Sequence, residues 1–321
     1  MGAQIAADDI VHRRTDSDGG RAPLLVLEPL REFLDAHGLG AGELRIAPLG
    51  DGHSNPTYAV TRGEQAFVLR RPPRPPYPKS AHNVLREARL LGALGATGAR
   101  VPQVLAVCED EAVIGAPFYV SGMVEGTVFT LATPPALDSP EEHLRIADEL
   151  VDALIEVHAV DWRAAGLESF GRPARYTERQ VRRFSTLLEE YRSRDIPALD
   201  RMTTWLQRNV PESADATIVH GDYRLGNVMF AHDAPARLVA VFDWEMATLG
   251  DPLADLGYMI TMWAEEGDPE GLLKLSAATT ARSYPSRGEL IERYAERSGR
   301  STRDIRWYAV LAIWKFCVIM L

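Results

Sequence analysis

The sequence has 321 residues, of which 46% are hydrophobic and 25% are charged, a balance typical of a soluble globular protein. This length favours two lobes over one small core. The formal net charge of −10 and the pI near 5.4 argue against a nucleic-acid partner or an anionic membrane surface. The two cysteines, Cys108 and Cys317, lie far apart and indicate neither a disulfide framework nor a zinc site, which is typical of a reducing, cytoplasmic compartment.

Residues 1–22 contain no apolar segment of the kind found in secretory signals, and we expect a disordered tail there. Short strand-like runs then dominate as far as about residue 125. They lie at residues 44–49, 56–60, 66–70, 103–107 and 117–124. One helical pattern interrupts them, with Ser80 as the expected N-cap and an apolar stripe from Val84 to Leu94. This part of the chain therefore predicts a small strand-rich lobe with one helix.

Helical patterns dominate the rest of the chain, for example between residues 141 and 160. The most hydrophobic stretch, residues 307–321, contains Lys315 and is short for a membrane span, so we expect a buried core helix and no membrane span. No glycine or proline stop signal follows it, which favours a chain cut short within this helix. The sequence thus predicts a larger, mainly helical second lobe.

A polar segment, HGDYRLGNVMF at residues 220–230, separates two apolar strand-like runs. Polar side chains in such a place are costly unless each has a partner or a function. Asp222 and Asn227 lie in this segment, and Asp243 follows a further strand-like run. A carboxylate together with a side-chain amide suits Mg²⁺, and the remaining carboxylate is available to accept a proton from a hydroxyl group. This division of roles indicates phosphoryl transfer.

The motif HGDYRLGN is similar to the kinase catalytic-loop pattern H-x-D-x-x-x-x-N in the form found in aminoglycoside phosphotransferases and their choline-kinase-like relatives, and FDWE resembles the counterpart of the kinase D-F-G segment. Further segments resemble the kinase-like domain linked to acyl-CoA dehydrogenases. These segments are HSNPTYAV, FVLRRPP, SAHNVLREARLL and DWEMATLGDPLADLGYM. The resemblance spans roughly residues 30–321. It implies an α+β, protein-kinase-like two-lobe fold, with an N-lobe at 23–120, a hinge at 121–126 and a C-lobe at 127–321.

The resemblance also implies a role for individual residues of the C-lobe. Asp222 is the expected catalytic base, and Asn227 and Asp243 are the expected Mg²⁺ ligands. The residues expected to support this loop structurally are His220, Arg224, Glu245 and Asp255.

In the N-lobe, the resemblance implies a nucleotide site. The residues expected to cover the ATP phosphates are Gly50, Gly52, His53, Ser54 and Asn55. Arg70 stands where kinases carry the lysine that binds the phosphates, and Glu87 is its expected ion-pair partner. The hinge residues expected to contact the adenine through their backbone are Gly122, Met123 and Val124.

We therefore expect a small-molecule kinase that uses ATP, or alternatively GTP, with Mg²⁺ to phosphorylate a hydroxyl group. A hydroxyacyl-CoA is the favoured acceptor from the resemblance, and an acyl-CoA dehydrogenase of the same pathway is the expected partner. Residues 172–208 carry nine arginines against five acidic residues, which suits an anionic acceptor or else forms a solvated helix face. An aminoglycoside, other antibiotic or sugar is the alternative acceptor. A nucleotide-binding pseudokinase scaffold is the alternative of another class, because Arg70 replaces the lysine.

Overall fold

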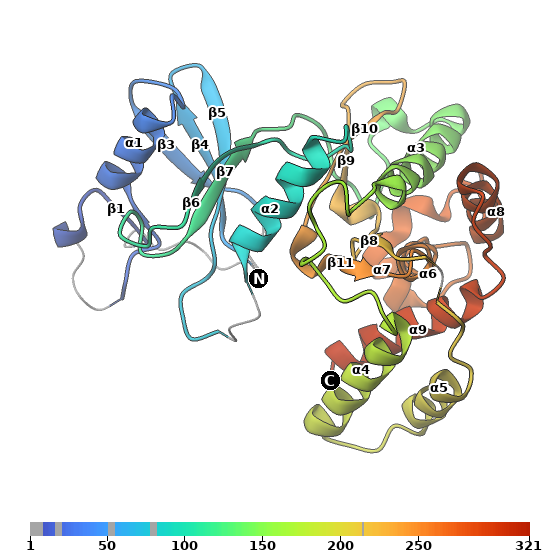
Figure 1. Ribbon diagram of the computed structural model, residues 1–321. Coiled ribbons are helices and arrows are strands. Elements are labelled where there is room, and N and C mark those ends of the chain that lie inside the picture. Colours follow the sequence, from blue (N-terminus) through green and yellow to red (C-terminus); the bar gives the residue numbers. More distant parts are fainter. Residues whose placement is uncertain (1–8, 17–20, 51–54, 78–81, 214) are drawn as a thin grey trace. The chain divides into compact units, whose positions relative to one another are not determined.

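The structure, a computed structural model, describes residues 9–16, 21–50, 55–77, 82–213 and 215–321. The chain forms two compact units (Figure 1). The first comprises residues 1–95 and 102–124, and the second comprises residues 96–101 and 125–321. Each unit has its own layer structure and is described by itself.

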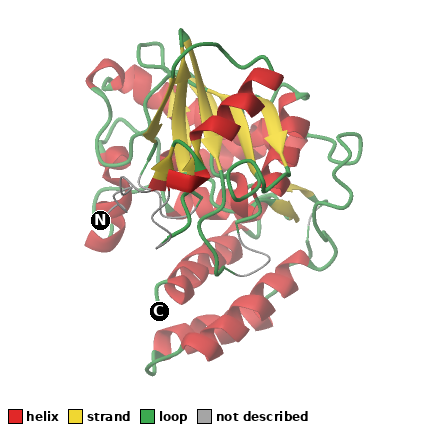
Figure 2. Ribbon diagram, turned by 90° about the vertical axis from the view of Figure 1, so that its left-hand side faces the viewer, coloured by secondary structure: helices red, strands yellow, loops and turns green. Residues whose placement is uncertain are grey.

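The first unit is built on a five-stranded antiparallel sheet with the strand order β3-β4-β5-β7-β6 (Figure 2). The strands are β3 (Leu44–Pro48), β4 (Thr57–Arg62), β5 (Gln65–Arg70), β6 (Val104–Cys108) and β7 (Phe118–Gly122). Each agrees with a predicted strand to within two residues at either end. Along β4 the side chains alternate between buried and partly exposed, as expected for a strand with one face against a core.

Two helices accompany this sheet. Helix α1 (Leu27–Ala36) buries Leu30 and Leu34 in the core cluster that also contains Tyr58 of β4. Helix α2 (Val84–Gly95) lies along β6 and β7 and buries its apolar stripe. The expected N-cap Ser80 lies outside the described residues; instead the Asn83 side chain accepts a hydrogen bond from the backbone N–H of Arg86 at 2.9 Å.

The prediction of a disordered tail over residues 1–22 is wrong for residues 9–16. Strand β1 (Ile10–Val11) pairs in parallel with β2 (Leu25–Val26), and a 3₁₀ turn, η2 (Arg14–Asp16), follows it. Val11 is buried, because its side chain gains hydrophobic stabilisation beside β2. The buried Asp9 also forms an ion pair with Arg74. Each of these strands is only two residues long, which is too short for alternation to be recognised in the sequence.

The second unit is mainly helical. Its helices are α3 (Pro140–Ala159), α4 (Tyr176–Tyr191), α5 (Pro197–Arg208), α6 (Leu253–Thr261), α7 (Glu270–Ser276), α8 (Arg287–Ser298) and α9 (Ile305–Ile319). Short 3₁₀ helices are η3 (Pro135–Leu137), η4 (Leu225–Asn227), η5 (Trp244–Met246) and η6 (Ala277–Thr280). Four short strands form two antiparallel pairs. Strand β8 (Thr217–Val219) pairs with β11 (Thr248–Gly250), and β9 (Val228–Phe230) pairs with β10 (Leu238–Val241).

Helix α9 is a buried core helix, as predicted. It packs against α4, α5 and α6 and buries Trp307, Tyr308 and Trp314. Its contact with α6 is close because Gly257 has no side chain: a Cβ at this position would lie 2.7 Å from Cβ of Tyr308. No helix among the described residues has the length and apolarity needed to cross a bilayer.

Candidate active site

Asn227 and Asp243 lie at the same end of the β9–β10 hairpin in the second unit. Asn227 is the last residue of η4, and β9 begins directly after it. The backbone N–H of Phe242 donates to the carbonyl of Asn227 at 2.8 Å, which extends the pairing of Val228 with Val241 by one step. Asp243 follows Phe242. Two residues that are sixteen positions apart in the sequence are thereby held on adjacent strand ends.

His220 links this hairpin end to the loop that precedes it. Its Nε2 lies 2.7 Å from the carbonyl oxygen of Phe242, and its Nδ1 accepts a hydrogen bond from the backbone N–H of Asp222 at 3.2 Å. Because Nδ1 is an acceptor, the ring carries its proton on Nε2 and donates it to Phe242. The ring is fully buried and packs beside Trp244. His220 therefore supports the loop and has no access to a reacting group.

Asp255, in the first turn of α6, holds the backbone of the same loop. Its carboxylate accepts hydrogen bonds from the backbone N–H of His220 at 2.7 Å and of Gly221 at 2.8 Å. His158 Nε2 lies 3.3 Å from the same carboxylate, and the other His158 nitrogen contacts the Tyr294 hydroxyl at 2.7 Å. Burial raises the pKa of Asp255, but the contact with His158 and the further polar partners outweigh burial and leave the pKa below its ordinary value. The ionised carboxylate is thus a fixed anchor for the loop.

Two loop residues adopt left-handed backbone conformations. Gly221 has φ = 90°, and a Cβ there would approach the carbonyl oxygen of Met246 to 2.9 Å, so only glycine fits. Asp243 has φ = 62°, which is uncommon for a residue other than glycine but is tolerated best by aspartate and asparagine. Asp243 directly precedes η5, and the partly exposed Glu245 lies within that turn.

Asp222 is surrounded by three polar side chains. The amide nitrogen of Asn227 donates to Oδ2 of Asp222 at 2.7 Å and to its backbone carbonyl at 2.8 Å. The guanidinium of Arg224 lies 3.5 Å from Oδ1. The side chain of Tyr258, on α6, interacts with the same carboxylate. Asp222 is only partly buried, so it remains accessible while its orientation is fixed.

Tyr258 is a site residue that the sequence analysis missed. Burial, and then the charge of Asp222 and the hydrogen bond to it, raise the pKa of Tyr258 well above its ordinary value, so the hydroxyl stays protonated and acts as a donor. Tyr258 lies three residues after Asp255, which places both on neighbouring positions of α6. The sequence could have pointed to Tyr258 through this spacing, because Asp255 was already expected to support the loop.

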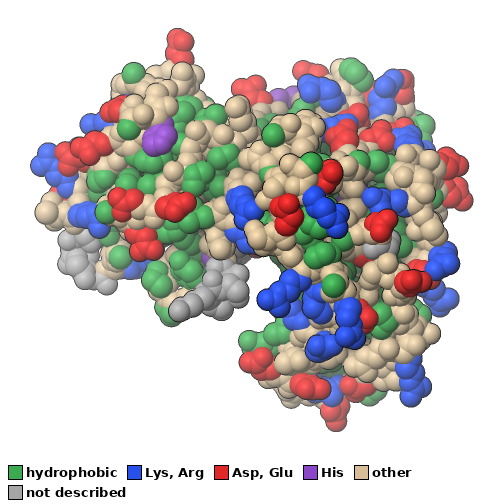
Figure 3. Space-filling model, in the orientation of Figure 1, with side chains coloured by type: hydrophobic (Ala, Val, Ile, Leu, Met, Phe, Trp, Pro, Cys, Tyr) green, Lys and Arg blue, Asp and Glu red, His purple; other side chains and the backbone are tan. Residues whose placement is uncertain are grey.

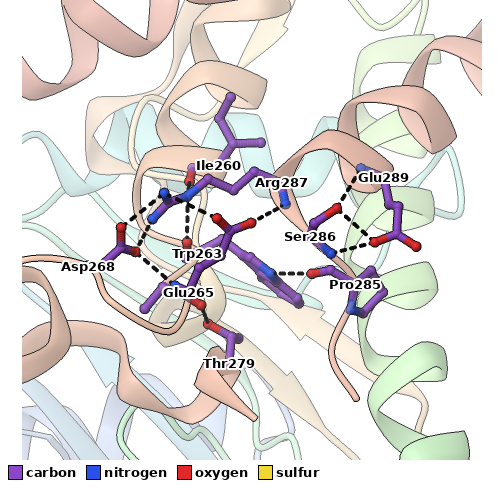
Figure 4. A network of polar contacts seen from close by, with 10 residues as sticks. Ile260, Trp263, Glu265, Asp268, Thr279, Pro285, Ser286, Arg287 and Glu289 are labelled. Atoms are coloured by element: carbon purple, nitrogen blue, oxygen red, sulfur yellow. Dashed lines mark hydrogen bonds and ion pairs between the residues drawn. The ribbon is translucent and has the colours of Figure 1, made fainter. Parts of the chain in front are cut away.

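The C-terminal end of α6 is locked by a polar network centred on Arg287 (Figure 4). Arg287 Nε donates to the carbonyl oxygens of Ile260 at 2.9 Å and Trp263 at 2.8 Å, and its guanidinium pairs with Asp268. The indole of Trp263 donates to the carbonyl of Pro285 at 2.9 Å. Because these contacts tie down the residues that follow α6, the helix presents Asp255 and Tyr258 from a rigid support.

In the first unit, the structure brings Arg70 and Glu87 together. Arg70 is the last residue of β5, and Glu87 lies in the first turn of α2. Arg70 Nε is 3.1 Å from a carboxylate oxygen of Glu87, whose side chain is only 3% exposed. Glu87 is therefore a buried ion-pair partner and not a solvated helix residue. Arg70 itself is 16% exposed and retains an accessible part of its side chain.

Only part of the predicted phosphate loop belongs to the described residues. Gly50, with φ = 75°, ends the segment after β3. The buried Asn55 contacts His82 through Oδ1 at 3.1 Å. The loop residues outside the described part of the chain are Gly52, His53 and Ser54.

The predicted hinge begins at the end of β7. The backbone N–H of Gly122 donates to the carbonyl of Gln103 at 2.9 Å. Met123 and Val124 follow the strand, and the chain enters the second unit after Val124.

The donor set at the hairpin end fits a hard cation. Both hydrogen bonds of the Asn227 side chain to Asp222 use its nitrogen, which leaves the amide oxygen available as a ligand beside the Asp243 carboxylate. Among the residues that the structure describes, no three His, Cys, Asp or Glu side chains lie close enough to hold a metal ion. Two oxygen ligands are nevertheless the usual protein share for Mg²⁺, whose other ligands are substrate phosphates and water.

A model of the phosphotransferase enzyme family matches residues 45–291, and the chain belongs to this family. This confirms the family predicted from the catalytic-loop motif. Membership supports a small-molecule kinase activity in general terms.

Among known proteins, the chain is similar to mouse acyl-CoA dehydrogenase family member 10, with 38% identity over 71% of this chain, and to chicken acyl-CoA dehydrogenase family member 11, with 35% identity over 87%. The chain spans 21% of the length of the first relative and 36% of the second.

Solved structures show the same fold. A Ralstonia eutropha protein described as a candidate aminoglycoside phosphotransferase has a TM-score of 0.78 and 34% identity, with 91% of this chain and 87% of that chain covered. The ternary complex of APH(2″)-IIa with streptomycin and ATP has a TM-score of 0.58 at 16% identity, with 92% and 90% covered. These structures confirm the kinase-like α+β fold class.

Proposed function

We propose that the protein transfers the γ-phosphoryl group of ATP to a hydroxyl group of a small molecule, with Asp222 as the general base. The observation that carries this proposal is the environment of Asp222. Its carboxylate is oriented by Asn227, Arg224 and Tyr258, and its loop is anchored by Asp255. An oriented, accessible carboxylate can accept the proton of an attacking hydroxyl group, which is what phosphoryl transfer requires of a protein side chain.

The remaining site residues would bind the nucleotide. Asn227 and Asp243 would hold Mg²⁺, which neutralises phosphate charge when it is bound. Arg70, oriented by Glu87, would bind the ATP phosphates in place of the usual lysine. We assign the adenine contact to the backbone of residues 122–124 and the phosphate cover to residues 50–55. In this proposal residues 23–120 form the nucleotide lobe, 121–126 the hinge, and 127–321 the catalytic lobe.

We further propose a hydroxyacyl-CoA as the acceptor and an acyl-CoA dehydrogenase as an enzyme of the same pathway. Support comes from the names of the relatives, which are acyl-CoA dehydrogenase family members at 35–38% identity. The nine arginines between residues 172 and 208 also disfavour a polycationic acceptor such as an aminoglycoside.

The test is a panel of acceptors: hydroxyacyl-CoAs, aminoglycosides, sugars and amino alcohols, each incubated with ATP and Mg²⁺. Asp222→Asn should lower turnover of the best acceptor by about 10² or more while ATP binding is kept. Asp233→Asn changes an exposed aspartate of the β9–β10 connection and serves as the matched control. Normal turnover by Asp222→Asn would remove Asp222 from the mechanism. ATP binding without transfer to any hydroxyl group would favour the pseudokinase alternative.

A further inference from the structure

Lys315 is a cation in an unusual position on α9. It lies seven residues, or two helical turns, after Tyr308, so the two side chains share one face of the helix. Tyr308 marks the direction of that face, because its hydroxyl donates to Asp251 at 2.7 Å and its Cβ packs on Gly257 of α6. The neighbour of Gly257 is Tyr258, which holds Asp222. The charges of Asp255 and Asp222 also act on the ammonium of Lys315, so its helix face lies toward the proposed base.

A second cation approaches Lys315 from α4. The ammonium of Lys315 lies 4.8 Å from the ring centre of Phe184, and the guanidinium of the adjacent Arg183 lies 5.8 Å from the same centre. Phe184 is buried, so one apolar ring is flanked by two positive charges. Figure 3 shows the Lys and Arg side chains, in blue, that gather on the surface around α4.

Within the part of the chain that the structure describes, no carboxylate forms an ion pair with Arg183 or Lys315. Two arginines at the start of α4 are engaged: Arg175 pairs with Glu178, and Arg179 donates to the backbone carbonyls of Ala174 and Arg172. Arg183 is exposed like its neighbour Arg182, so what distinguishes it within α4 is its contact with the Phe184 ring that Lys315 also contacts.

The two cations repel each other, and this arrangement has a cost. Desolvation, with the positive charge of Arg183 as a further cause, lowers the pKa of Lys315 to about 8, although Asp255 and Asp222 act in the opposite direction. A partly desolvated, unpaired ammonium next to another cation destabilises the folded chain unless an anion compensates it. Because the face of α9 that carries Lys315 lies toward Asp222, a compensating anion would bind on the side of Asp222.

We propose that Arg183 and Lys315 bind an anionic group of the acceptor, a carboxylate or a phosphate, with Phe184 contacting the adjoining apolar carbons. This inference rests on the proposed function, because it assigns the acceptor to the side of Asp222 formed by α4, α6 and α9. It assigns binding residues to an anionic acceptor, a class that includes the hydroxyacyl-CoA proposed above. Arg183 and Lys315 are binding residues here, and the proton transfer remains with Asp222.

The experiment separates anion binding from phosphoryl transfer. Titration calorimetry on the whole chain, without ATP, measures the binding of three probes: inorganic phosphate, 3-hydroxybutyrate as a carboxylate, and coenzyme A as a phosphate-rich ligand. The variants are Lys315→Met, Lys315→Arg and Arg183→Gln, and Arg201→Gln is the control because it removes an exposed arginine of the neighbouring helix α5. Melting temperatures establish that each variant is folded. ATP binding and ATP-dependent transfer are measured in parallel.

We expect Lys315→Met and Arg183→Gln to weaken binding of the preferred probe about tenfold or more, as expected for a lost charge-assisted hydrogen bond. Lys315→Arg should retain most of the affinity, and Arg201→Gln should bind normally. Preference for 3-hydroxybutyrate or for the phosphate probes identifies the source of the anion. The inference is overturned if no probe binds the wild type, or if Lys315→Met and Arg183→Gln bind as the wild type does. Failure of the proposed function is distinct: it is the absence of ATP-dependent transfer when anion binding is intact.

Discussion

The side-chain amide of Asn227 donates hydrogen bonds to both the backbone carbonyl and the carboxylate of Asp222, at 2.8 and 2.7 Å. Both acceptors belong to one residue five positions earlier, so the amide closes the loop between them. The nitrogen is thereby used, and the amide oxygen is the remaining polar atom of the side chain. A single residue thus couples the orientation of the proposed base to the proposed metal site.

Removing the metal ligands should abolish the magnesium dependence of nucleotide binding. Asn227→Ala and Asp243→Ala each replace an oxygen ligand by a methyl group, so Mg²⁺ should no longer increase the thermal stabilisation produced by ATP. Thermal-shift titrations with ATP, with and without Mg²⁺, measure this directly. The titration without Mg²⁺ is the internal control and should change little. A full magnesium-dependent shift in both variants would contradict the assignment.

Tyr258→Phe should lower kcat about tenfold and leave the KM for ATP unchanged. The substitution removes the hydroxyl group that interacts with Asp222 and keeps the ring, so the carboxylate loses part of its fixed orientation while the fold is retained. Steady-state kinetics with the best acceptor of the panel provide the measurement. Tyr191→Phe, at an exposed tyrosine of α4, is the matched control. If kcat is unaffected, the contact between Tyr258 and Asp222 has no role in turnover.

Asp255 should make stability depend on acid pH. Its folded-state pKa lies below the ordinary value of 3.8, so the ionised form is stabilised by folding. This contribution is present at pH values above 3.8 and is lost as pH falls through the lower, folded-state pKa. Asp255→Asn should therefore be less stable than the wild type by about 2 kcal/mol or more at neutral pH, with the difference shrinking in acid.

Urea unfolding at a series of pH values tests this prediction. Asp195→Asn, at an exposed aspartate, should follow the wild type throughout. A stability difference for Asp255→Asn that stays constant from pH 7 down to strongly acid conditions would show that the carboxylate charge is not what anchors the loop.

Arg70 and Glu87 should act as a unit. Arg70→Ala should raise the KM for ATP and lower kcat, and Glu87→Ala should give a milder form of the same defect. The double variant should be less than additive, with a coupling on the order of 1 kcal/mol, because the two side chains share one ion pair. Arg70→Lys is the informative substitution, since equal or improved turnover would identify an ordinary kinase site. Normal ATP use by Arg70→Ala would contradict the assignment of β5 to phosphate binding.

Sequence patterns determined those features that depend on short stretches of chain. The five strands of the first unit, the α2 stripe and the apolar α9 were predicted to within a few residues, because alternation and helical spacing are local properties. The loop motif was also readable, since Asp222 and Asn227 are five residues apart and their contact forms within one turn.

Tertiary structure alone decided the contacts between distant segments. The pairing of Ile10–Val11 with Leu25–Val26 converts part of an expected tail into a strand. Tyr258 reaches Asp222 from thirty-six residues away, and Lys315 is directed by the packing of Tyr308 on Gly257. Such contacts carry no periodic signal, because they arise when whole helices pack and their side chains take the directions that the backbone imposes. The sequence therefore determined which groups perform the proposed chemistry, while the packing of α4, α6 and α9 decided which charges surround them.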